Sequence, residues 1–307
     1  MARRDSSEVV IKKQGFFPKT EKIMERPRTY LILAVLALGT SGCITEGKPL
    51  STSEPIAKTV LPTIGDEIER RRNASIETLP KEWRETAEQA LSSMVYLNFP
   101  EGVICGGAVV ENLGTQFVVA AAAHCWDMAA KHDYLIVNNL DTFGTIQGDT
   151  FYKYGLGRIC SENCGEYNPV NDLLVIALNL NREHLTDGLF PATTASVDSE
   201  TQLKVGDEVL LTSLGGASYF EALTIHAQVG RIKAIENPEE PSKTLLITEG
   251  LRVIAQDSGG GVFIKGKDGK PKLVAIQSGY VDIGTAVLKP IRNLEELKQM
   301  ALEDLKK

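Results

Sequence analysis

From residue 94 onward, hydrophobic positions occur in short runs separated by turn residues. The runs are rich in β-branched and other apolar side chains, a pattern typical of strands with a buried face. They cover residues 94–99, 108–111, 116–121, 134–137, 173–178, 208–214, 227–234, 244–247, 261–264, 273–278 and 284–288. Because no long helical pattern separates them, the sequence predicts an all-β barrel or sandwich.

Two stretches beside these runs have apolar residues at helical spacing. Residues 82–93 predict a short helix that docks on the strands after it, and residues 291–306 predict an amphipathic helix that closes the domain. Their apolar positions are Trp83, Ala87, Ala90, Leu91 and Met94 in the first stretch, and Leu294, Leu297, Met300, Ala301 and Leu305 in the second. We therefore expect residues 80–307 to form one folded domain.

The residues before this domain are of two kinds. Residues 43–79 are polar and contain several prolines and a run of charges, which predicts a tether. Residues 30–39 are apolar but number about ten, whereas a membrane-spanning helix needs about twenty. Two arginines precede them and small residues follow them, the arrangement of a secretory signal. Residues 1–42 are thus expected to be a signal peptide, with Met24 as the true start.

The sequence Thr-Ser-Gly-Cys at residues 40–43 resembles the lipobox of bacterial lipoproteins, in which the cysteine is acylated and becomes the mature amino terminus. Thr40 occupies the position that usually holds Leu. The resemblance implies a lipid anchor at Cys43, and Ile44 after it favours sorting to the outer membrane. We therefore expect an exported protein of the cell envelope, anchored in the outer membrane or facing the periplasm. The alternative is an ordinary signal peptide that is cleaved nearby.

The overall charge argues against one class of partner. The chain has 33 basic and 40 acidic residues, a formal net charge of -7, and 43% of its residues are hydrophobic. This is the composition of a folded protein rather than a disordered one. Because phosphate backbones are bound by positive surfaces, nucleic acid is not expected as a partner.

The cysteine count also fits an exported chain. Setting Cys43 aside leaves an even number that could pair, namely Cys105, Cys125, Cys160 and Cys164. Three pairings are possible, of which Cys105 with Cys125 and Cys160 with Cys164 is the natural one. A tetrathiolate zinc site is the alternative, but it usually uses two CxxC pairs and the sequence has none. No metal or cofactor is therefore expected.

Three short motifs carry residues of hydrolytic chemistry. They are AAAHC ending at Cys125, NDLLVIAL starting at Asn171, and QDSGGGVF starting at Gln256. A serine nucleophile needs a base to take its proton and a carboxylate to hold that base in the right tautomer. His124, Asp172 and Ser258 could supply these roles.

The motifs resemble those of the chymotrypsin/trypsin family of serine proteases, TAAHC, DIALL and GDSGGP, in the same chain order. The resemblance covers roughly residues 93–307 and implies a chymotrypsin-like double β-barrel with the active site between the barrels. It implies that His124 is the general base, Asp172 its orienting carboxylate and Ser258 the nucleophile. It also implies the Cys105–Cys125 disulfide, and an oxyanion hole formed by the backbone N–H groups of Gln256 and Ser258.

The sequence departs from the family at two points. Gln256 stands where the family has Gly, and a side chain there would add strain if the site needs a backbone angle that only Gly adopts readily. In the animal members, the counterpart of Asp257 is paired by a new Ile-Val-Gly-Gly terminus, which no sequence before Met94 supplies. Asp257 is therefore expected to find another partner or to cap a local turn.

The resemblance also suggests a specificity pocket. It places Arg252 at the base and Gln277, Ser278, Gly279 and Tyr280 in the wall. A buried Arg would reject basic side chains and could bind a carboxylate, which predicts cleavage after Glu or Asp. The alternative is that Arg252 points to solvent or pairs with an acidic neighbour such as Glu249, which leaves a small or neutral pocket.

Together, these features predict an exported, lipid-anchored serine endopeptidase that hydrolyses peptide or protein substrates through an acyl-enzyme. Two alternatives belong to other classes. A pseudoprotease would keep the fold as a binding or scaffold lipoprotein, with Gln256 disrupting the oxyanion hole. A serine esterase or other acyl transferase would use the same triad on another substrate.

Overall fold

The computed structural model describes ten segments of the chain. They all lie within one compact unit, Pro62–Lys307. The segments are residues 64–98, 104–113, 116–127, 136–138, 156–160, 169–179, 193–215, 224–254, 257–292 and 294–305. The expected signal peptide, lipobox and lipidated Cys43 therefore lie outside the described residues.

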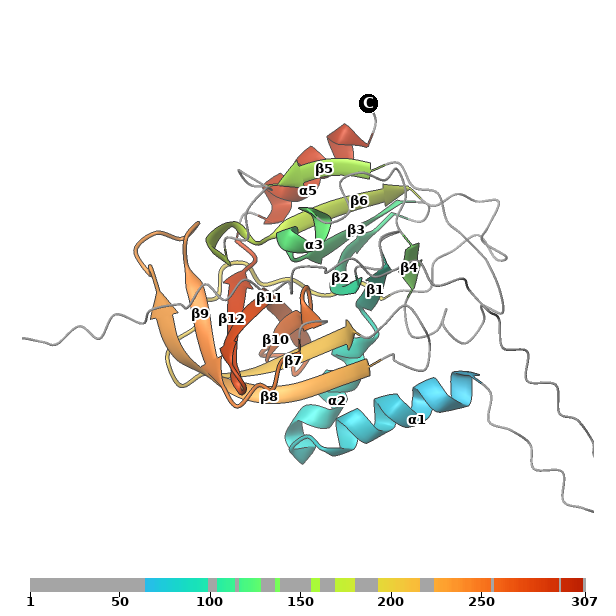
Figure 1. Cartoon of the computed structure of the whole chain (residues 1–307), viewed down its shortest axis with the longest axis vertical. Helices are drawn as coiled ribbons and strands as arrows, with labels where there is room; N and C mark the ends of the chain where they lie inside the picture. The colour runs from blue at the N-terminus through green and yellow to red at the C-terminus, as the bar shows by residue number, and fades with distance from the viewer. Residues whose placement is uncertain are drawn as a thin grey trace, which may run out of the picture. The chain divides into compact units, whose positions relative to one another are not determined.

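The first half of the unit forms an open antiparallel sheet in the strand order β4-β1-β2-β3-β6-β5 (Figure 1). Its strands are β1 (Met94–Asn98), β2 (Ile104–Asn112), β3 (Gln116–Ala121), β4 (Ile136–Asn138), β5 (Leu156–Cys160) and β6 (Leu174–Asn179). The central strand β3 is buried along nearly its whole length, because it pairs with β2 on one side and β6 on the other. The strand ends with two small side chains, Ala120 and Ala121, that are fully buried.

The second half forms a closed barrel in the order β10-β11-β12-β9-β8-β7. Its strands are β7 (Glu208–Gly215), β8 (Thr224–Glu236), β9 (Leu245–Glu249), β10 (Gly261–Lys265), β11 (Pro271–Asp282) and β12 (Thr285–Pro290). The inward positions of these strands form a core of aliphatic side chains, including Leu211, Ile232 and Leu288. Burial of such side chains is the main force that stabilises the barrel.

The expectation of a mostly β fold is confirmed, but the structure has only one closed barrel among its described strands. The other half is a sheet whose edge strands β4 and β5 do not pair with each other in the described part of the chain. Strand β5 was not expected from the sequence. Its five residues, LGRIC, combine Gly and Arg with apolar residues and give no alternating pattern.

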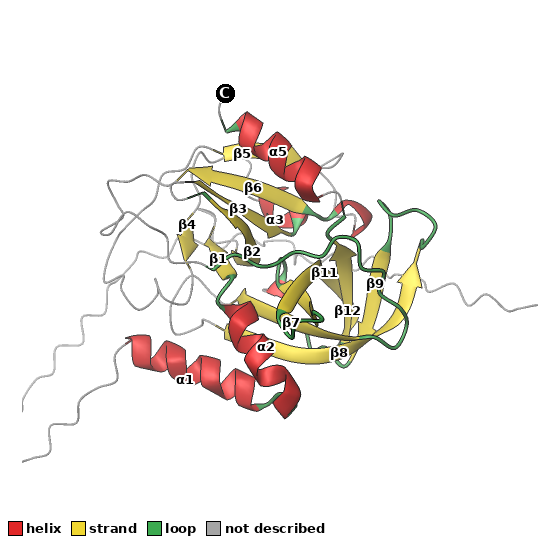
Figure 2. Ribbon diagram, turned by 180° about the vertical axis from the view of Figure 1, so that it is seen from behind, coloured by secondary structure: helices red, strands yellow, loops and turns green. Residues whose placement is uncertain are grey.

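Two of the described helices were expected from the sequence and two were not, one of the latter being the short helix Ala123–Asp127. Helix α2 (Lys81–Leu91) buries Trp83 and Ala87, and α5 (Leu294–Asp304) packs on β5 and β6 as the closing helix (Figure 2). Helix α1 (Ile64–Glu77) occupies residues that were expected to be part of the tether. It packs against α2 and β8, where Ile68 joins the core.

Helix α1 escapes sequence-based detection because its buried face is narrow. Charged groups dominate its surface, and two arginines, Arg70 and Arg71, bind Glu67 within the helix. These contacts lower the pKa of Glu67 to about 2, the side-chain hydrogen bond from Arg70 being the largest cause. None of the helices in the described ranges is long and apolar enough to cross a membrane.

Candidate active site

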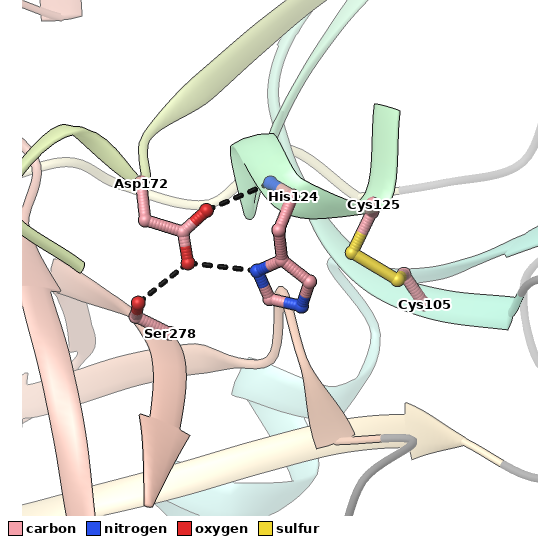
Figure 3. The surroundings of a disulfide bond; sticks show 5 residues. All are labelled: Cys105, His124, Cys125, Asp172 and Ser278. Atoms are coloured by element: carbon pink, nitrogen blue, oxygen red, sulfur yellow. Dashed lines mark hydrogen bonds and ion pairs between the residues drawn. A yellow bond between two sulfur atoms is a disulfide. The ribbon is translucent and has the colours of Figure 1, made fainter. Parts of the chain in front are cut away.

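A short helix after β3 presents His124. Helix α3 (Ala123–Asp127) begins directly behind the buried residues Ala121 and Ala122, so the position of His124 is fixed by the sheet. The His124 backbone N–H donates to Oδ1 of Asp172 at 2.8 Å, and its ring Nδ1 lies 2.8 Å from Oδ2 (Figure 3). Asp172 thus holds both the backbone and the ring of the histidine.

The carboxylate of Asp172 is almost completely buried, with 2% of its surface exposed. It lies between the 3-10 turn η1 (Pro169–Asn171) and the start of β6. A third donor, the hydroxyl of Ser278 on β11, also binds its Oδ2 (Figure 3). Because Asp172 is joined to Nδ1, Nε2 is the ring nitrogen that can take a proton from a nucleophile.

The disulfide expected from the sequence is formed between Cys105 on β2 and Cys125 on α3, with their Cα atoms 6.3 Å apart. It joins the helix that carries His124 to the sheet, since Cys125 follows His124 directly (Figure 3). The second expected bridge, between Cys160 and Cys164, stays a prediction. Cys160 ends β5, and Cys164 lies outside the described residues.

The double variant Cys105→Ser, Cys125→Ser is expected to lower the free energy of unfolding by about 2 to 4 kcal/mol. The bridge closes a loop with a sequence separation of 20, and its loss frees the unfolded chain and loosens α3. Urea denaturation of the oxidised wild type and the variant measures the effect. Equal unfolding free energies for the two proteins would contradict it.

The turn that carries Ser258 is held between the two halves of the unit. The N–H of Gly106 on β2 donates to the Ser258 carbonyl at 2.7 Å. On the other side, the N–H of Gly259 donates to the Gln277 carbonyl at 2.9 Å, and the N–H of Gln277 donates to Gly260 at 2.8 Å. Ser258 itself is 7% exposed, so backbone contacts with both the sheet and the barrel fix its position.

Gly259 explains how the turn can lie so close to the sheet. Its φ angle is +83°, a region that favours glycine, and a Cβ atom would lie 2.0 Å from the carbonyl oxygen of Gly106. The glycine after the candidate nucleophile is therefore required by geometry at this position.

Asp257, directly before Ser258, has another partner, which is one of the two outcomes expected from the sequence. It is completely buried, and its carboxylate binds the hydroxyl of Ser213 on β7 and the ring of His226 on β8. The sequence alone does not predict a role for His226, because its pairing depends on the register of the barrel strands.

The structure therefore brings His124, Asp172 and Ser278 into one hydrogen-bonded group. The pairing of Ser258 with His124 stays a prediction, as does the oxyanion hole, because Gln256 lies outside the described residues. No cluster of three potential metal ligands occurs within the segments that the structure describes.

The residues expected to form a specificity pocket have different surroundings. The side chain of Arg252 is exposed and its backbone is bound on both sides by the amide of Gln228, at 2.7 and 2.9 Å. The exposed side chain agrees with the alternative expectation, in which Arg252 points to solvent, and not with a buried charge at the base of a pocket. Gln277 is buried, and its amide donates to the Gly279 carbonyl. Tyr280 is half-buried, whereas the hydroxyl of Ser278 is bound to Asp172, a contact that the sequence did not reveal.

Comparison with known proteins finds weak similarity to solved structures. No protein-family profile and no curated protein matches the chain. The chain is similar to the crystal structure of Rv3671c from M. tuberculosis H37Rv, a serine-to-alanine mutant in the inactive form, with a TM-score of 0.46 and 15% identity over 71% of this chain and 90% of that chain. A second structure, of the Rv3671c protease in its inactive form, gives a TM-score of 0.45 and 15% identity over 70% of this chain and 92% of that chain. At this level of similarity, the assignment of the site rests on the contacts described above.

Proposed function

We propose that the protein is a serine endopeptidase with a chymotrypsin-like double β-barrel arrangement, acting through His124, Asp172 and Ser258. The observation that carries the proposal is the buried Asp172 carboxylate, which accepts from both the backbone and the ring of His124. Such a carboxylate stabilises the imidazolium that forms when the histidine takes a proton. A merely structural histidine does not require this double contact.

The proposed reaction proceeds in two stages. The Ser258 oxygen attacks the carbonyl carbon of the peptide while its proton moves to Nε2 of His124, and the oxyanion is bound by the backbone N–H groups of Gln256 and Ser258. His124 then gives the proton to the leaving amine, so that the C–N bond breaks and an acyl-enzyme forms. Water attacks the ester with His124 again as base, which releases the acid and restores the serine.

Labelling with a fluorophosphonate probe tests this function. The probe phosphonylates an activated serine, so mass spectrometry of the digested wild type should place the label on Ser258. Labelling should be lost in His124→Ala, because the serine then has no base. A folded wild type that takes no label at Ser258 would contradict the proposal and favour a binding or scaffold lipoprotein. Labelling without peptide turnover but with ester turnover would favour an esterase.

The proposed location is the cell envelope, with a lipid anchor at Cys43. Support comes from the Thr-Ser-Gly-Cys sequence that ends the apolar segment. Cys43→Ser is expected to release the protein from the membrane fraction or to block its processing, because the thiol that would carry the lipid is absent. Membrane fractionation and intact mass measure the result. Unchanged fractionation together with an unchanged acyl mass would contradict the anchor.

Arg252 is exposed and does not form the base of a buried pocket, so any acidic preference is proposed to come from a surface contact of its guanidinium with a bound peptide. We expect cleavage after Glu or Asp from a mixed peptide library, and Arg252→Gln should reduce this preference about threefold, the effect of an exposed ion pair. Lys233→Gln, an exposed charge change on β8, serves as the control. Enrichment of small apolar residues before the cut would instead indicate a neutral pocket, and enrichment of Lys or Arg would contradict both arrangements.

A further inference from the structure

The residue directly before the candidate nucleophile is a buried carboxylate. Asp257 has no exposed surface, and it accepts hydrogen bonds from the Ser213 hydroxyl at 2.5 Å and from the Ile254 backbone N–H at 2.9 Å. The ring Nδ1 of His226 lies 2.9 Å from one carboxylate oxygen and 3.1 Å from the other. An ionised carboxylate without contact to water needs such partners, because its desolvation is otherwise very costly.

Two of these partners, Ser213 and His226, come from neighbouring strands of the barrel. Ser213 and His226 are directly opposite each other in the register of β7 and β8, which lie side by side (Figure 1). Opposite residues of an antiparallel pair point to the same face of the sheet, so both side chains reach Asp257 together. In the described part of the chain, His226 is the one cationic group that the structure pairs with Asp257.

Backbone hydrogen bonds connect Asp257 to the turn that carries Ser258. The Asp257 N–H donates to Ile254 at 3.0 Å, and the Gly260 N–H donates to the Asp257 carbonyl at 2.8 Å. These two bonds hold the peptide groups on both sides of Asp257, whose side chain is in turn held by Ser213, Ile254 and His226. One of these peptide groups is the Ser258 N–H, the proposed oxyanion donor.

We propose that His226 is a positioning residue: in its protonated form it neutralises Asp257 and keeps the turn of Ser258 in its catalytic geometry, and loss of its proton loosens that turn. This inference rests on the proposed function. It extends that function to the regulation of the site by pH, through a group that does not contact the substrate.

The direction of the pH effect follows from the surroundings of the ring. The hydrogen bond and charge of Asp257 raise the pKa of His226, whereas partial burial and the charge of Arg252 act in the opposite direction. A histidine with a raised pKa in the ordered state stabilises that state below its ordinary pKa of about 6.5. This contribution is lost as the pH rises through the raised value. Activity should therefore decline on the alkaline side.

Several other charged groups near these strands are bound elsewhere. On α1, whose Ser75 accepts from the N–H of Ala227 next to His226, the arginines Arg70 and Arg71 bind Glu67, and Arg72 binds Glu88 of α2. At the far end of β7 and β8, Arg231 binds Glu208.

Lys289 is the main competing explanation for an alkaline decline. Its pKa is lowered to about 8, first by burial and then by the charge of Arg292, while the charge of Asp172 acts in the opposite direction. Its deprotonation could therefore act on the site through Asp172 instead of Asp257.

The test compares pH profiles of kcat and KM, from about pH 5 to about pH 10, for the wild type, His226→Gln, Lys233→Gln and Lys289→Met. Gln keeps a hydrogen-bond donor but cannot carry a proton. We expect His226→Gln to have a flat alkaline side, about tenfold lower kcat near pH 6, and KM within about twofold of the wild type. The wild type should fall toward the level of this variant at high pH. Lys233→Gln, with its exposed charge on the same strand, should match the wild type.

An unchanged alkaline decline in His226→Gln, or its loss in Lys289→Met instead, would overturn the proposal. A second measurement is independent of turnover and of the folding of the variant. In the Ser258→Ala protein, NMR titration of the His226 ring is compared with amide-exchange protection of residues 257–260, corrected for intrinsic exchange. Protection should fall as the ring loses its proton. Constant protection through that titration would overturn the role of His226, whether or not the wild type hydrolyses peptides.

Discussion

Ser258→Ala and His124→Ala are each expected to lower kcat/KM for a peptide substrate by about a thousandfold or more. The first change removes the proposed attacking oxygen, and the second removes the proposed base, which Asp172 holds through two contacts of 2.8 Å. In the proposed mechanism the two residues act on one proton transfer. Their combination should therefore cost little more than either change alone, since effects within such a unit are far from additive.

Steady-state kinetics on the purified variants measures this loss, and denaturation checks that the fold is intact. Both variants should keep an unfolding free energy within about 1 kcal/mol of the wild type. Ser93→Ala is the matched control, since it removes another buried hydroxyl, one that binds the Ala90 carbonyl at the end of α2. Residual turnover within about tenfold of the wild type in either variant would contradict the triad.

Gly259→Ala is expected to lower the free energy of unfolding by about 4 kcal/mol or more, through positive-φ strain and a close backbone contact. The new Cβ would lie 2.0 Å from the Gly106 oxygen and 2.9 Å from its carbonyl carbon. Neither atom belongs to a flexible side chain, so β2 and the Ser258 turn would have to separate. Activity should fall as well, because the Gly106–Ser258 hydrogen bond breaks.

Gly269→Ala separates these two causes. Gly269 also has a positive φ, +78°, but a Cβ there meets nothing within 4 Å. We expect this change to cost only about 1 to 2 kcal/mol, which is the strain of the backbone conformation. Equal destabilisation by both substitutions would show that the close approach of the Ser258 turn to β2 is unimportant.

The strands and two helices could be predicted because their patterns are local. The run from 116 to 121 coincides with β3, and the periodic apolar residues after 80 coincide with α2. Strand β5 has no alternating pattern and helix α3 is too short to establish a period, so sequence patterns miss both. Helix α1 has a largely polar surface, and it packs against α2, which follows it directly, and against β8, which lies far away in the sequence.

In the candidate site, too, residues within local motifs could be predicted, whereas contacts between distant parts of the sequence could not. Local motifs pointed to His124, Asp172 and Ser258, and to the cysteine beside the histidine. The contact of Ser278 with Asp172 spans 106 positions, and that of His226 with Asp257 spans 31. Such pairs depend on strand register and barrel closure, which no short segment encodes.

The docking of α1 changes where a recombinant fragment of this protein should begin. A boundary at residue 80 looks natural from composition, yet it would remove Ile68, which is 4% exposed, and uncover apolar surface on its neighbours. It would also remove the Ser75 oxygen that binds the Ala227 N–H, one position from His226. A fragment that starts at residue 62 keeps both contacts. We therefore expect it to be better folded than a fragment that starts at residue 80, and to be the better choice for expression and crystallisation.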